Sequence, residues 1–410
     1  MNYRLPRQII KWSPWALLVL SAATAACGQS DTSAWMVPPP GNPAKPQIER
    51  PVTTVALAAA AAPHSLAWPR ERHSATLLRD GRVLVVGGSA ASGGAVATAE
   101  MLDPSTGLWS PAGNMGYPRA DHTATYLRDG RVLIAGGRNS DGDPLSATEV
   151  NYPYVDISLW RPGDDMSEAR TGHTATLLQD GRVLVVGGSN GAGSLASAEL
   201  FDPVTDTWSP AGAMKDARAA HTATLLDDGR VVVIGGEQNG ESLESVELYD
   251  ALTGQWSSAP DMSVPRKNHT ATLLADRRVL VSGGESVGGL SLSEAEVYDT
   301  ASGSWSSTQS MTRIRVDHTA TPLGDGRVLV VGGSRSLLGN PAQGEVFDPF
   351  SETWTLIANS PMARRGHTTT LRYGGRLLVV GGRGVSGVLA STTGFDPSGN
   401  SWSWTSVAKP

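Results

Sequence analysis

Hydrophobic and polar positions follow the same order seven times along the chain. In the third repeat, the segment 173–178 (HTATLL) precedes Asp180-Gly181, the apolar segment 183–186 (VLVV) and a pair of glycines. The copies begin 48 to 51 residues apart, and a fixed period of this size is typical of repeated supersecondary units. Each copy begins at a histidine: His73, His122, His173, His221, His269, His318 and His367.

Each repeat predicts four antiparallel strands. The alternation in 173–178 indicates the first strand, and Asp-Gly favours a type I′ hairpin turn into the second. The second strand is apolar at consecutive positions, so we expect neighbouring sheets to cover both of its faces. Residues 198–203 (AELFDP) form the predicted third strand, and Trp208 opens the fourth. The pattern contains no helical period between them.

Glycine, tryptophan and methionine recur at fixed places within the repeats. The glycine pair allows a sharp turn or a close approach of a neighbouring backbone. A large indole and a pliable thioether at constant spacing are suited to filling the wedge between sheets. The tryptophans are Trp109, Trp160, Trp208, Trp256, Trp305, Trp354 and Trp402, and the methionines are Met115, Met166, Met214, Met262, Met311 and Met362.

Twist accumulates between strands, so seven such sheets are expected to close radially. The glycine pair, the later aromatic-Asp pair (Phe201-Asp202 in the third repeat) and the spaced tryptophan resemble the kelch repeat over residues 70–408. In detail the sequence resembles the kelch-containing lipoproteins of bacteria. The resemblance implies an all-β, seven-bladed kelch-type β-propeller with four antiparallel strands per blade, the first strand innermost. How the ring closes is left open, since every unit contains its own four strands.

The N-terminal segment predicts export. Basic residues at 4, 7 and 11 precede a short apolar run at 15–23, which is too short to span a bilayer. The small residues before Cys27 resemble a bacterial lipoprotein signal, in which the cysteine becomes the lipidated N-terminus. An ordinary signal peptide cleaved after Ala25, leaving a free thiol, is the alternative. We therefore divide the chain into a signal peptide (1–26), a Pro/Ala-rich tether (27–65) and the propeller (66–410).

Charge and cysteine content exclude several classes of function. The net charge of −6 gives no basic footprint for nucleic acid. Cys27 is the one cysteine, so neither an intramolecular disulfide nor zinc-finger spacing is available. Some kelch propellers are copper oxidases that depend on a cysteine linked to a tyrosine, and this composition does not fit them.

A ring of arginines is the first candidate site. Seven guanidinium groups near the mouth of a channel would attract carboxylate, sulfate or phosphate. The alternative is structural, because six repeats also carry a glutamate on the third strand with which the arginine can pair. The candidate ligand-binding residues are Arg70, Arg119, Arg170, Arg218, Arg266, Arg315 and Arg364; the glutamates are Glu100, Glu149, Glu199, Glu247, Glu296 and Glu345, with Thr393 in the seventh repeat.

The histidines and a second set of arginines also recur once in each repeat. A seven-fold ring of histidines does not converge on one metal, so we expect each to bond backbone of its own or the next blade, and we predict no metal site. A second arginine set (Arg82, Arg131, Arg182, Arg230, Arg278, Arg327 and Arg376) is predicted to serve the hairpins. The pairs between arginine and histidine, such as Glu71-Arg72, vary between repeats, as do the loops between second and third strands. In the kelch family these loops share one face that commonly binds ligands.

Together these features predict an exported, membrane-anchored binding or scaffold module, or a secreted one. Its loop-rich face would meet an envelope or extracellular protein or polysaccharide, with the outer membrane as the location in a Gram-negative cell. We expect a monomer without a cofactor, catalytic residues or a nucleic-acid partner. The alternative is a sugar-processing enzyme, similar to epimerases or mutarotases, with its site at the central channel. A locally asymmetric channel wall would favour the enzyme.

Overall fold

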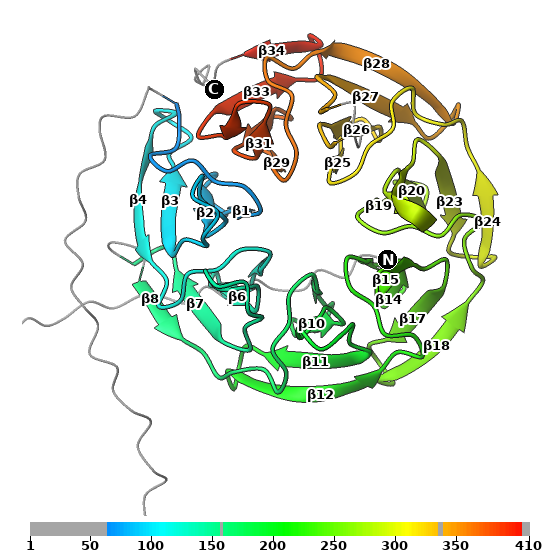
Figure 1. The fold of residues 1–410 in the computed structure, drawn as a ribbon, viewed down its shortest axis with the longest axis horizontal. Helices are drawn as coiled ribbons and strands as arrows, with labels where there is room; N and C mark the ends of the chain where they lie inside the picture. The colour runs from blue at the N-terminus through cyan, green and yellow to red at the C-terminus, as the bar shows by residue number, and fades with distance from the viewer. Residues whose placement is uncertain (1–63, 156–158, 335–338, 404–410) are drawn as a thin grey trace, which may run out of the picture. The chain divides into compact units, whose positions relative to one another are not determined.

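Seven four-stranded antiparallel sheets stand in chain order around a central channel (Figure 1). The computed structural model describes residues 64–155, 159–334 and 339–403, all within one compact unit, Leu57–Pro410. The predicted seven-bladed all-β propeller is confirmed. The predicted signal peptide, Cys27 and residues 27–63 of the predicted tether lie outside the described residues. Among the described residues, no helix is long and apolar enough to cross a membrane.

The two inner strands of each blade form the wall of the channel and the layer behind it. The innermost strands are β1 (Ser74–Leu77), β5 (Thr123–Tyr126), β9 (Thr174–Leu177), β13 (Thr222–Leu225), β19 (Thr270–Leu273), β25 (Thr319–Pro322) and β29 (Thr368–Leu371). The second strands are β2 (Val83–Val86), β6 (Val132–Ala135), β10 (Val183–Val186), β14 (Arg230–Ile234), β20 (Arg278–Ser282), β26 (Val328–Val331) and β30 (Leu377–Val380).

The two outer strands complete each blade. The third strands are β3 (Thr98–Leu102), β7 (Thr148–Tyr152), β11 (Ser197–Asp202), β17 (Val246–Asp250), β23 (Ala295–Asp299), β27 (Gln343–Asp348) and β33 (Thr392–Asp396). The rim strands are β4 (Trp109–Asn114), β8 (Leu159–Pro162), β12 (Thr207–Ala213), β18 (Gln255–Ala259), β24 (Ser304–Ser307), β28 (Thr353–Asn359) and β34 (Ser401–Ser403).

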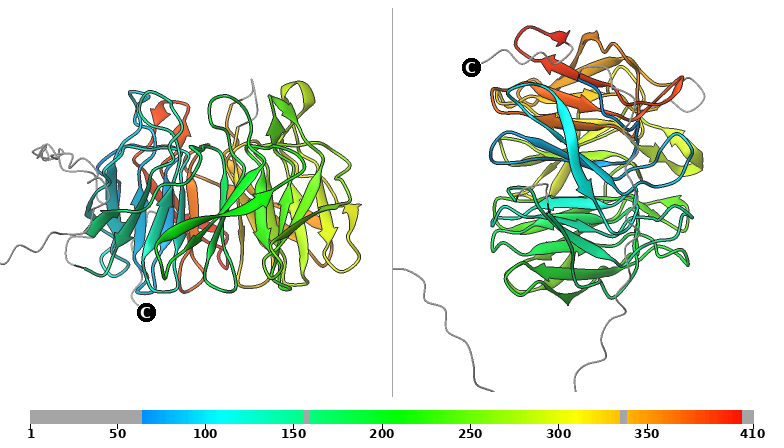
Figure 2. Two further views of the ribbon diagram at one scale, coloured as in Figure 1. Left: turned by 90° about the horizontal axis from the view of Figure 1, so that it is seen from below. Right: turned by 90° about the vertical axis from the view of Figure 1, so that its left-hand side faces the viewer.

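The loops between second and third strands project from one face, which we call the loop face (Figure 2). Three of them form small hairpins: β15 (Glu237–Gln238) with β16 (Glu241–Ser242), β21 (Glu285–Ser286) with β22 (Leu290–Ser291), and β31 (Arg383–Gly384) with β32 (Gly387–Val388). The turn η1 (Val287–Gly289) lies within the second hairpin. The hairpins between first and second strands lie on the opposite face, which we call the hairpin face.

The second strands form the centre of the hydrophobic core. Every residue of β2 and β10 is completely buried, and residues of both pack against strands of a neighbouring blade. This confirms the prediction that consecutive apolar positions mark a strand covered on both faces. Burial of this apolar surface between blades supplies most of the favourable free energy of folding.

The hairpin turns fold back as predicted, but the predicted turn type is wrong. A type I′ turn needs positive φ at two residues. In the first blade only Gly81 has positive φ (+84°), and its N–H bonds the carbonyl of Leu78. The connection is therefore a type I turn followed by one left-handed residue, where glycine fits best. In the fifth blade Arg277 takes this left-handed position with φ +71°.

The glycine pairs are where neighbouring blades meet most closely. A Cβ on Gly235 would lie 2.5 Å from the carbonyl oxygen of Arg266 and 3.1 Å from the imidazole of His269, both in the next blade. The second glycine, Gly236, donates its N–H to that same arginine carbonyl at 2.9 Å. The same bond recurs at all seven blade interfaces, from Gly88 to Arg119 through Gly382 to Arg70. The predicted close approach of backbones is confirmed.

We expect Gly235→Ala to destabilise the propeller by at least 2 kcal/mol more than Gly240→Ala, on the order of a core overpacking penalty. Both glycines are left-handed, with φ +58° and +92°, so both variants carry the backbone strain. Only Gly235 has a backbone oxygen in the way, since nothing lies within 4 Å of a Cβ on Gly240. Urea unfolding followed by tryptophan fluorescence measures the difference. Equal losses would mean that the blades can move apart without cost.

The tryptophans bridge blades as well as filling the wedge. Trp256 packs on Tyr249 of its own blade with ring centroids 5.1 Å apart, and its indole N–H donates to Ala211 O of the preceding blade at 2.8 Å. Five other repeat tryptophans make the same inter-blade bond. The Trp109 indole nitrogen is buried without an acceptor among the described residues. These indoles therefore have the packing role that their spacing predicts.

One methionine assignment is wrong. Five methionines lie in linkers between blades, and each donates its backbone N–H to the blade that comes before its linker. They are all buried: Met115, Met166, Met214, Met262 and Met311. In the linker between the sixth and last blades the equivalent bond, to Ala342 O, is made by Ser360, so Met362 lies two residues beyond the equivalent position. At the first blade the same place is taken by Leu66, which bonds Ala390 O.

That bond also explains how the ring closes. The blades do not exchange strands, because β29, β30, β33 and β34 all come from the last repeat. Instead, the segment before β1 docks on the last blade as the inter-blade linkers do elsewhere, with Arg70 N donating to Leu389 O. Closure rests on residues more than 300 positions apart in sequence, which repeat periodicity cannot show.

Candidate functional site

The arginine ring lies in the interior of the blades. All seven side chains have 0% exposed surface, and six form ion pairs with the third-strand glutamate of their own blade. The nitrogen–oxygen distances are 2.7 Å (Arg70–Glu100), 2.9 Å (Arg119–Glu149), 2.8 Å (Arg170–Glu199), 2.7 Å (Arg218–Glu247), 2.6 Å (Arg266–Glu296) and 2.9 Å (Arg315–Glu345). The guanidinium groups also donate to backbone carbonyls, as Arg218 does to Gly235 and Ser245.

Each ion pair fastens the linker that enters a blade. Glu247 accepts one bond from the arginine, and its carboxylate also accepts the backbone N–H groups of Lys215 and Asp216 in the linker. The seven arginines are therefore not placed to bind a ligand, which corrects the expectation from the sequence. A guanidinium without exposed surface offers no donor to a dissolved anion. The structural alternative, pairing between arginine and glutamate, describes these residues.

The last blade departs from this arrangement. Thr393 replaces the glutamate, and Arg364 bonds the carbonyls of Gly381 and Ser391 but forms no ion pair with a carboxylate of the described residues. Burial without a counter-charge lowers the pKa of Arg364 to about 10. Pro361 begins the corresponding linker segment, and proline has no N–H for a glutamate to accept. Loss of the glutamate and presence of the proline are thus consistent with each other.

The histidines form a second ring, which links neighbouring blades. Each Nε2 shares a hydrogen bond of 2.9–3.1 Å with a Ser or Thr hydroxyl at the start of the preceding innermost strand. The last of these, between His73 and Thr368, joins the first and last blades. The Nε2 atoms therefore bond a hydroxyl of the adjacent strand rather than the backbone that we expected. Burial lowers the pKa of His221 to about 3, and the charge of Arg218 adds to the effect.

The channel wall is nearly the same from the second blade to the sixth. The part between β5 and β25 is lined by Thr, Ala and the edges of the histidine rings, for example Thr174, Ala175 and His221. In the described residues, no group of three or more His, Cys, Asp or Glu side chains is placed to hold a metal ion. The asymmetry that an enzyme would need does not occur in this stretch of the wall.

Asymmetry begins at the mouth of the channel on the loop face. The residue before each repeat histidine has left-handed φ, from +52° to +64°, and we call these seven residues the collar. Six of the seven neighbouring pairs are joined by backbone hydrogen bonds, such as Asp121 N to Arg72 O at 3.1 Å. The collar consists of Arg72, Asp121, Gly172, Ala220, Asn268, Asp317 and Gly366. Sequence reasoning missed this conformation, although Gly, Asn and Asp at five of the positions are the residues that tolerate it best.

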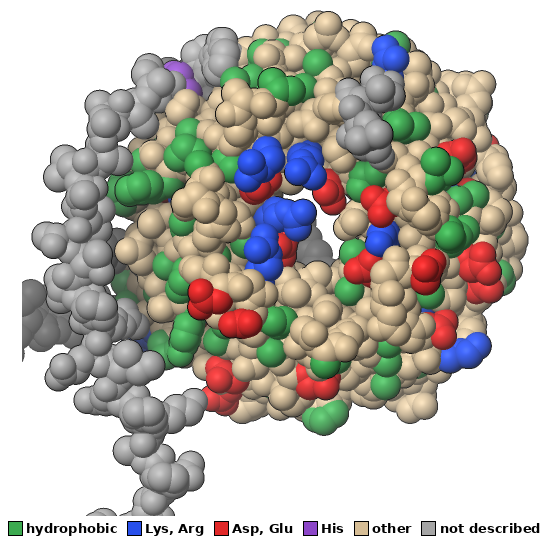
Figure 3. Space-filling view, in the orientation of Figure 1, with side chains coloured by type: hydrophobic (Ala, Val, Ile, Leu, Met, Phe, Trp, Pro, Cys, Tyr) green, Lys and Arg blue, Asp and Glu red, His purple; other side chains and the backbone are tan. Residues whose placement is uncertain are grey.

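Charged side chains gather around this mouth (Figure 3). Asp121 pairs with Arg72 at 3.2 Å and with Arg138 at 2.7 Å, which joins the first two blades. Arg383 of the last blade pairs with Glu71 of the first at 2.7 Å. Burial raises the pKa of Asp317, which lies near the cations Arg72 and Arg365. The third blade contributes uncharged Thr171 and Gly172, so one side of the mouth is charged and the other is neutral.

A crevice of about 460 Å³ lies beside the charged side of the mouth. It is lined by Glu285, Val316, Ser334, Asn340, Arg365 and Arg383 among others, from the last three blades. Arg365 makes no side-chain hydrogen bond or ion pair among the described residues, whereas Arg383 is held by Glu71. The crevice thus presents a guanidinium without a hydrogen bond or ion pair in the described part of the chain beside one held by Glu71, which suits recognition of a carboxylate or another oxyanion.

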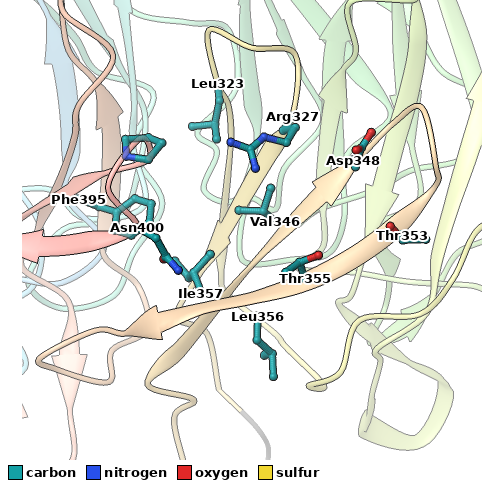
Figure 4. A pocket seen from close by; sticks show the side chains of 11 residues that line it. Leu323, Arg327, Val346, Asp348, Thr353, Thr355, Leu356, Ile357, Phe395 and Asn400 are labelled. Carbon is teal, nitrogen blue, oxygen red and sulfur yellow. The ribbon is translucent and has the colours of Figure 1, made fainter.

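A second cleft lies between the last two blades, away from the mouth. Its walls include Leu323, Val346, Ile357 and Phe395, and it holds about 200 Å³ (Figure 4). Asn400 crosses it to accept the N–H of Ala358 at 3.1 Å. Its charged groups are already engaged, since Arg327 pairs with Asp325. We therefore interpret the cleft as imperfect packing between two blades and not as a second site.

The second arginine set serves the hairpins, as predicted. Arg82, Arg131, Arg182, Arg230, Arg278 and Arg327 each pair with the turn aspartate two residues earlier, at 2.6–2.8 Å. Three of them also bond the next blade, as Arg278 does with Pro349 O at 2.9 Å. Arg376 follows a Gly-Gly turn and pairs instead with Asp396 at 3.1 Å.

Comparisons with known proteins agree with this architecture. Among curated proteins, no sequence gives a significant match. A solved structure titled as a novel fungal alcohol oxidase with catalytic diversity among the AA5 family, in complex with copper, has a TM-score of 0.67. It shares 18% identity over 81% of this chain and 76% of its own. The structure of YjhT has a TM-score of 0.56, with 16% identity over 70% of this chain and 98% of its own.

Identities this low show a shared fold, and fold alone does not carry an activity over. Copper chemistry is therefore not assigned to this chain. The family model for the KLHDC2/KLHL20/DRC7 Kelch-repeats domain matches residues 72–263 and 220–410. Because these matches span more than half of the chain, the protein belongs to the KLHDC2/KLHL20/DRC7 Kelch-repeats domain family.

Proposed function

We propose that this kelch propeller is a binding module whose loop face holds a protein partner at the charged side of the channel mouth. The observation that carries the proposal is the crevice in which Arg365, which forms no side-chain hydrogen bond or ion pair with another described residue, lies beside the ion-paired Arg383. Positions that vary between repeats are released from the structural requirement of the fold, and here they gather charge at one place. A protein segment with an acidic side chain or terminal carboxylate fits two guanidinium groups.

The rest of the mouth supports binding more than catalysis. Hydrogen bonds between collar residues hold the backbone fixed, which lowers the entropy lost when a partner docks. The wall between β5 and β25 repeats the same Thr, Ala and His groups, so no observation favours the sugar-processing alternative.

We include export and anchoring through Cys27 in the proposal. The support is the basic start of the chain, the apolar run at 15–23 and the small residues before the cysteine. A lipid anchor would keep the propeller in the cell envelope, where its partner would be met. The intact mass of the chain purified from producing cells tests this: a mature chain that begins at an acylated Cys27 agrees, and an unmodified thiol does not.

Replacing the two crevice arginines is expected to weaken binding of the partner at least tenfold, on the order of the loss of one charge-assisted hydrogen bond. The partner is captured from envelope extracts with the full chain, identified, purified and titrated by biolayer interferometry. The test variant is Arg365→Ala with Arg383→Ala. The matched control is Arg182→Ala, which removes an ion-paired arginine from the hairpin face. Equal affinity of all three chains, or capture of glycan alone, would overturn the proposal.

A further inference from the structure

The hairpin face carries a second group of cations that the proposed function does not use. The outermost residue of each inner hairpin differs between blades, so the fold does not prescribe it. In chain order these residues are Arg79, Arg128, Gln179, Asp227, Ala275, Gly324 and Tyr373. The last and first blades are neighbours in the ring, so Tyr373, Arg79 and Arg128 form one continuous arc.

The two arginines of this arc keep their charge unneutralised. Both are exposed, and each donates to a backbone carbonyl of the next blade: Arg79 to Arg128 O, and Arg128 to Gln179 O. Neither forms an ion pair among the described residues, unlike the second arginine set with its turn aspartates. A guanidinium has five N–H donors, so donors remain for a ligand.

A third arginine precedes Tyr373 in the hairpin of the last blade, at a position where the other blades have a hydrophobic residue. Arg372 stands where the other six blades have a buried leucine: Leu78, Leu127, Leu178, Leu226, Leu274 and Leu323. It is half-buried, and its side chain makes no hydrogen bond or ion pair among the described residues. Burial, and then the like charge of Arg376, lower the pKa of Arg372. A charge in such a place is costly unless an anion compensates it.

Tyrosines flank these cations. Tyr373 is 67% exposed, and its ring lies 3.4 Å from where a Cβ on Gly81 of the first blade would be. Tyr126 ends β5 where five other blades have leucine, and the Arg79 guanidinium lies 5.9 Å from its ring centroid. The Tyr126 hydroxyl shares a hydrogen bond of 2.8 Å with that of Tyr154, which accepts the backbone N–H of Arg79 at 3.0 Å. Tyr126 and Tyr154 are thus held beside the Arg79 guanidinium group.

We propose that this arc, formed by Arg372, Tyr373, Arg79, Tyr126 and Arg128, binds an anionic saccharide. Guanidinium groups bind the carboxylate or sulfate of the sugar, and the tyrosine rings pack on its C–H faces and offer hydroxyls to its own. A nucleic acid is a poorer fit, because the chain carries a net charge of −6 and, in the described part of the chain, three arginines of this arc lack a carboxylate partner. The site lies on the face opposite the proposed protein-binding mouth.

Binding of the full chain to three polysaccharides tests this: polygalacturonate with carboxylates, dextran sulfate with sulfates, and neutral dextran. We expect calorimetry to show binding to one or both charged chains and not to dextran, and the charged chain that binds identifies the anion. A single-stranded oligonucleotide is the fourth probe. Tighter binding to it than to either polysaccharide, or no binding to either charged polysaccharide, would overturn the proposal.

The variant Arg372→Leu gives the sharpest test, because it restores the residue that every other blade folds with. We expect it to fold normally and to bind the charged saccharide at least tenfold more weakly, and Arg79→Gln to do the same. Arg230→Gln removes an arginine of the same face that is paired with Asp228, and should bind as the parent does. If Arg372→Leu and Arg79→Gln retain parental affinity, the arc is not the site.

Discussion

Acidification from pH 7 to pH 5 is expected to destabilise the propeller steeply. The seven repeat histidines are buried and neutral, and burial lowers the pKa of five of them to about 3 and of His73 and His269 well below the ordinary 6.5. Between these values the unfolded chain binds protons that the folded chain cannot, so the free energy of unfolding falls as the pH falls. Each histidine contributes up to about 1.4 kcal/mol per pH unit. Full stability is present only above about pH 6.5.

Urea unfolding at intervals from pH 8 to pH 5 measures this slope. His221→Gln keeps a polar partner for Thr174 but removes one titrating group, so its slope should be smaller by at most about 1.4 kcal/mol per pH unit. Asp317 acts in the opposite direction, because burial raises its pKa, but it is one group against seven. If the free energy of unfolding is constant between pH 7 and pH 5, the buried histidines take up protons in the folded propeller, and the expectation is wrong.

Much of this architecture follows from local pattern. Consecutive apolar residues predict that the second strands are buried, and the glycine pairs predict a close approach of two backbones. The pairing of Arg218 with Glu247 was open to prediction as well, because the two residue types recur together at every blade but the last. In a repeat protein each unit contacts only its neighbours, so a rule that holds within one repeat holds for the ring.

The features that sequence could not supply depend on contacts between distant residues or on departures from the repeat. Leu66 takes a methionine's place only because the ring brings it to Ala390. Ser360, which Pro361 follows, makes the bond to Ala342 that a methionine makes at the other linkers. The arginine ring was ambiguous for a different reason: a guanidinium that binds an anion and one that binds a buried carboxylate leave the same sequence, and only burial separates them. The crevice at Arg365 and the arc at Arg372 both lie where the last blade breaks the pattern.

Arg218→Met is expected to lower the free energy of unfolding by about 3–5 kcal/mol, the cost of leaving one partner of a buried ion pair alone. Arg218 is fully buried, and its loss leaves the Glu247 carboxylate, itself 3% exposed, with two linker N–H groups as its donors among the residues that the structure describes. Methionine fills much of the volume, so an empty cavity contributes little. Guanidinium chloride unfolding at pH 7 measures the change.

The last blade supplies the matched control. Arg364→Met removes an equally buried arginine, but no carboxylate remains behind, because Thr393 stands in the glutamate position. We expect a loss of about 1–3 kcal/mol, from the carbonyls of Gly381 and Ser391 that lose a donor. The double variant Arg218→Met with Glu247→Met should recover part of the loss of the single one, since replacing a whole buried pair by apolar residues is often nearly neutral. If Arg218→Met and Arg364→Met cost the same, the ring acts through its carbonyl bonds, and the glutamates fasten the linkers without help from the arginines.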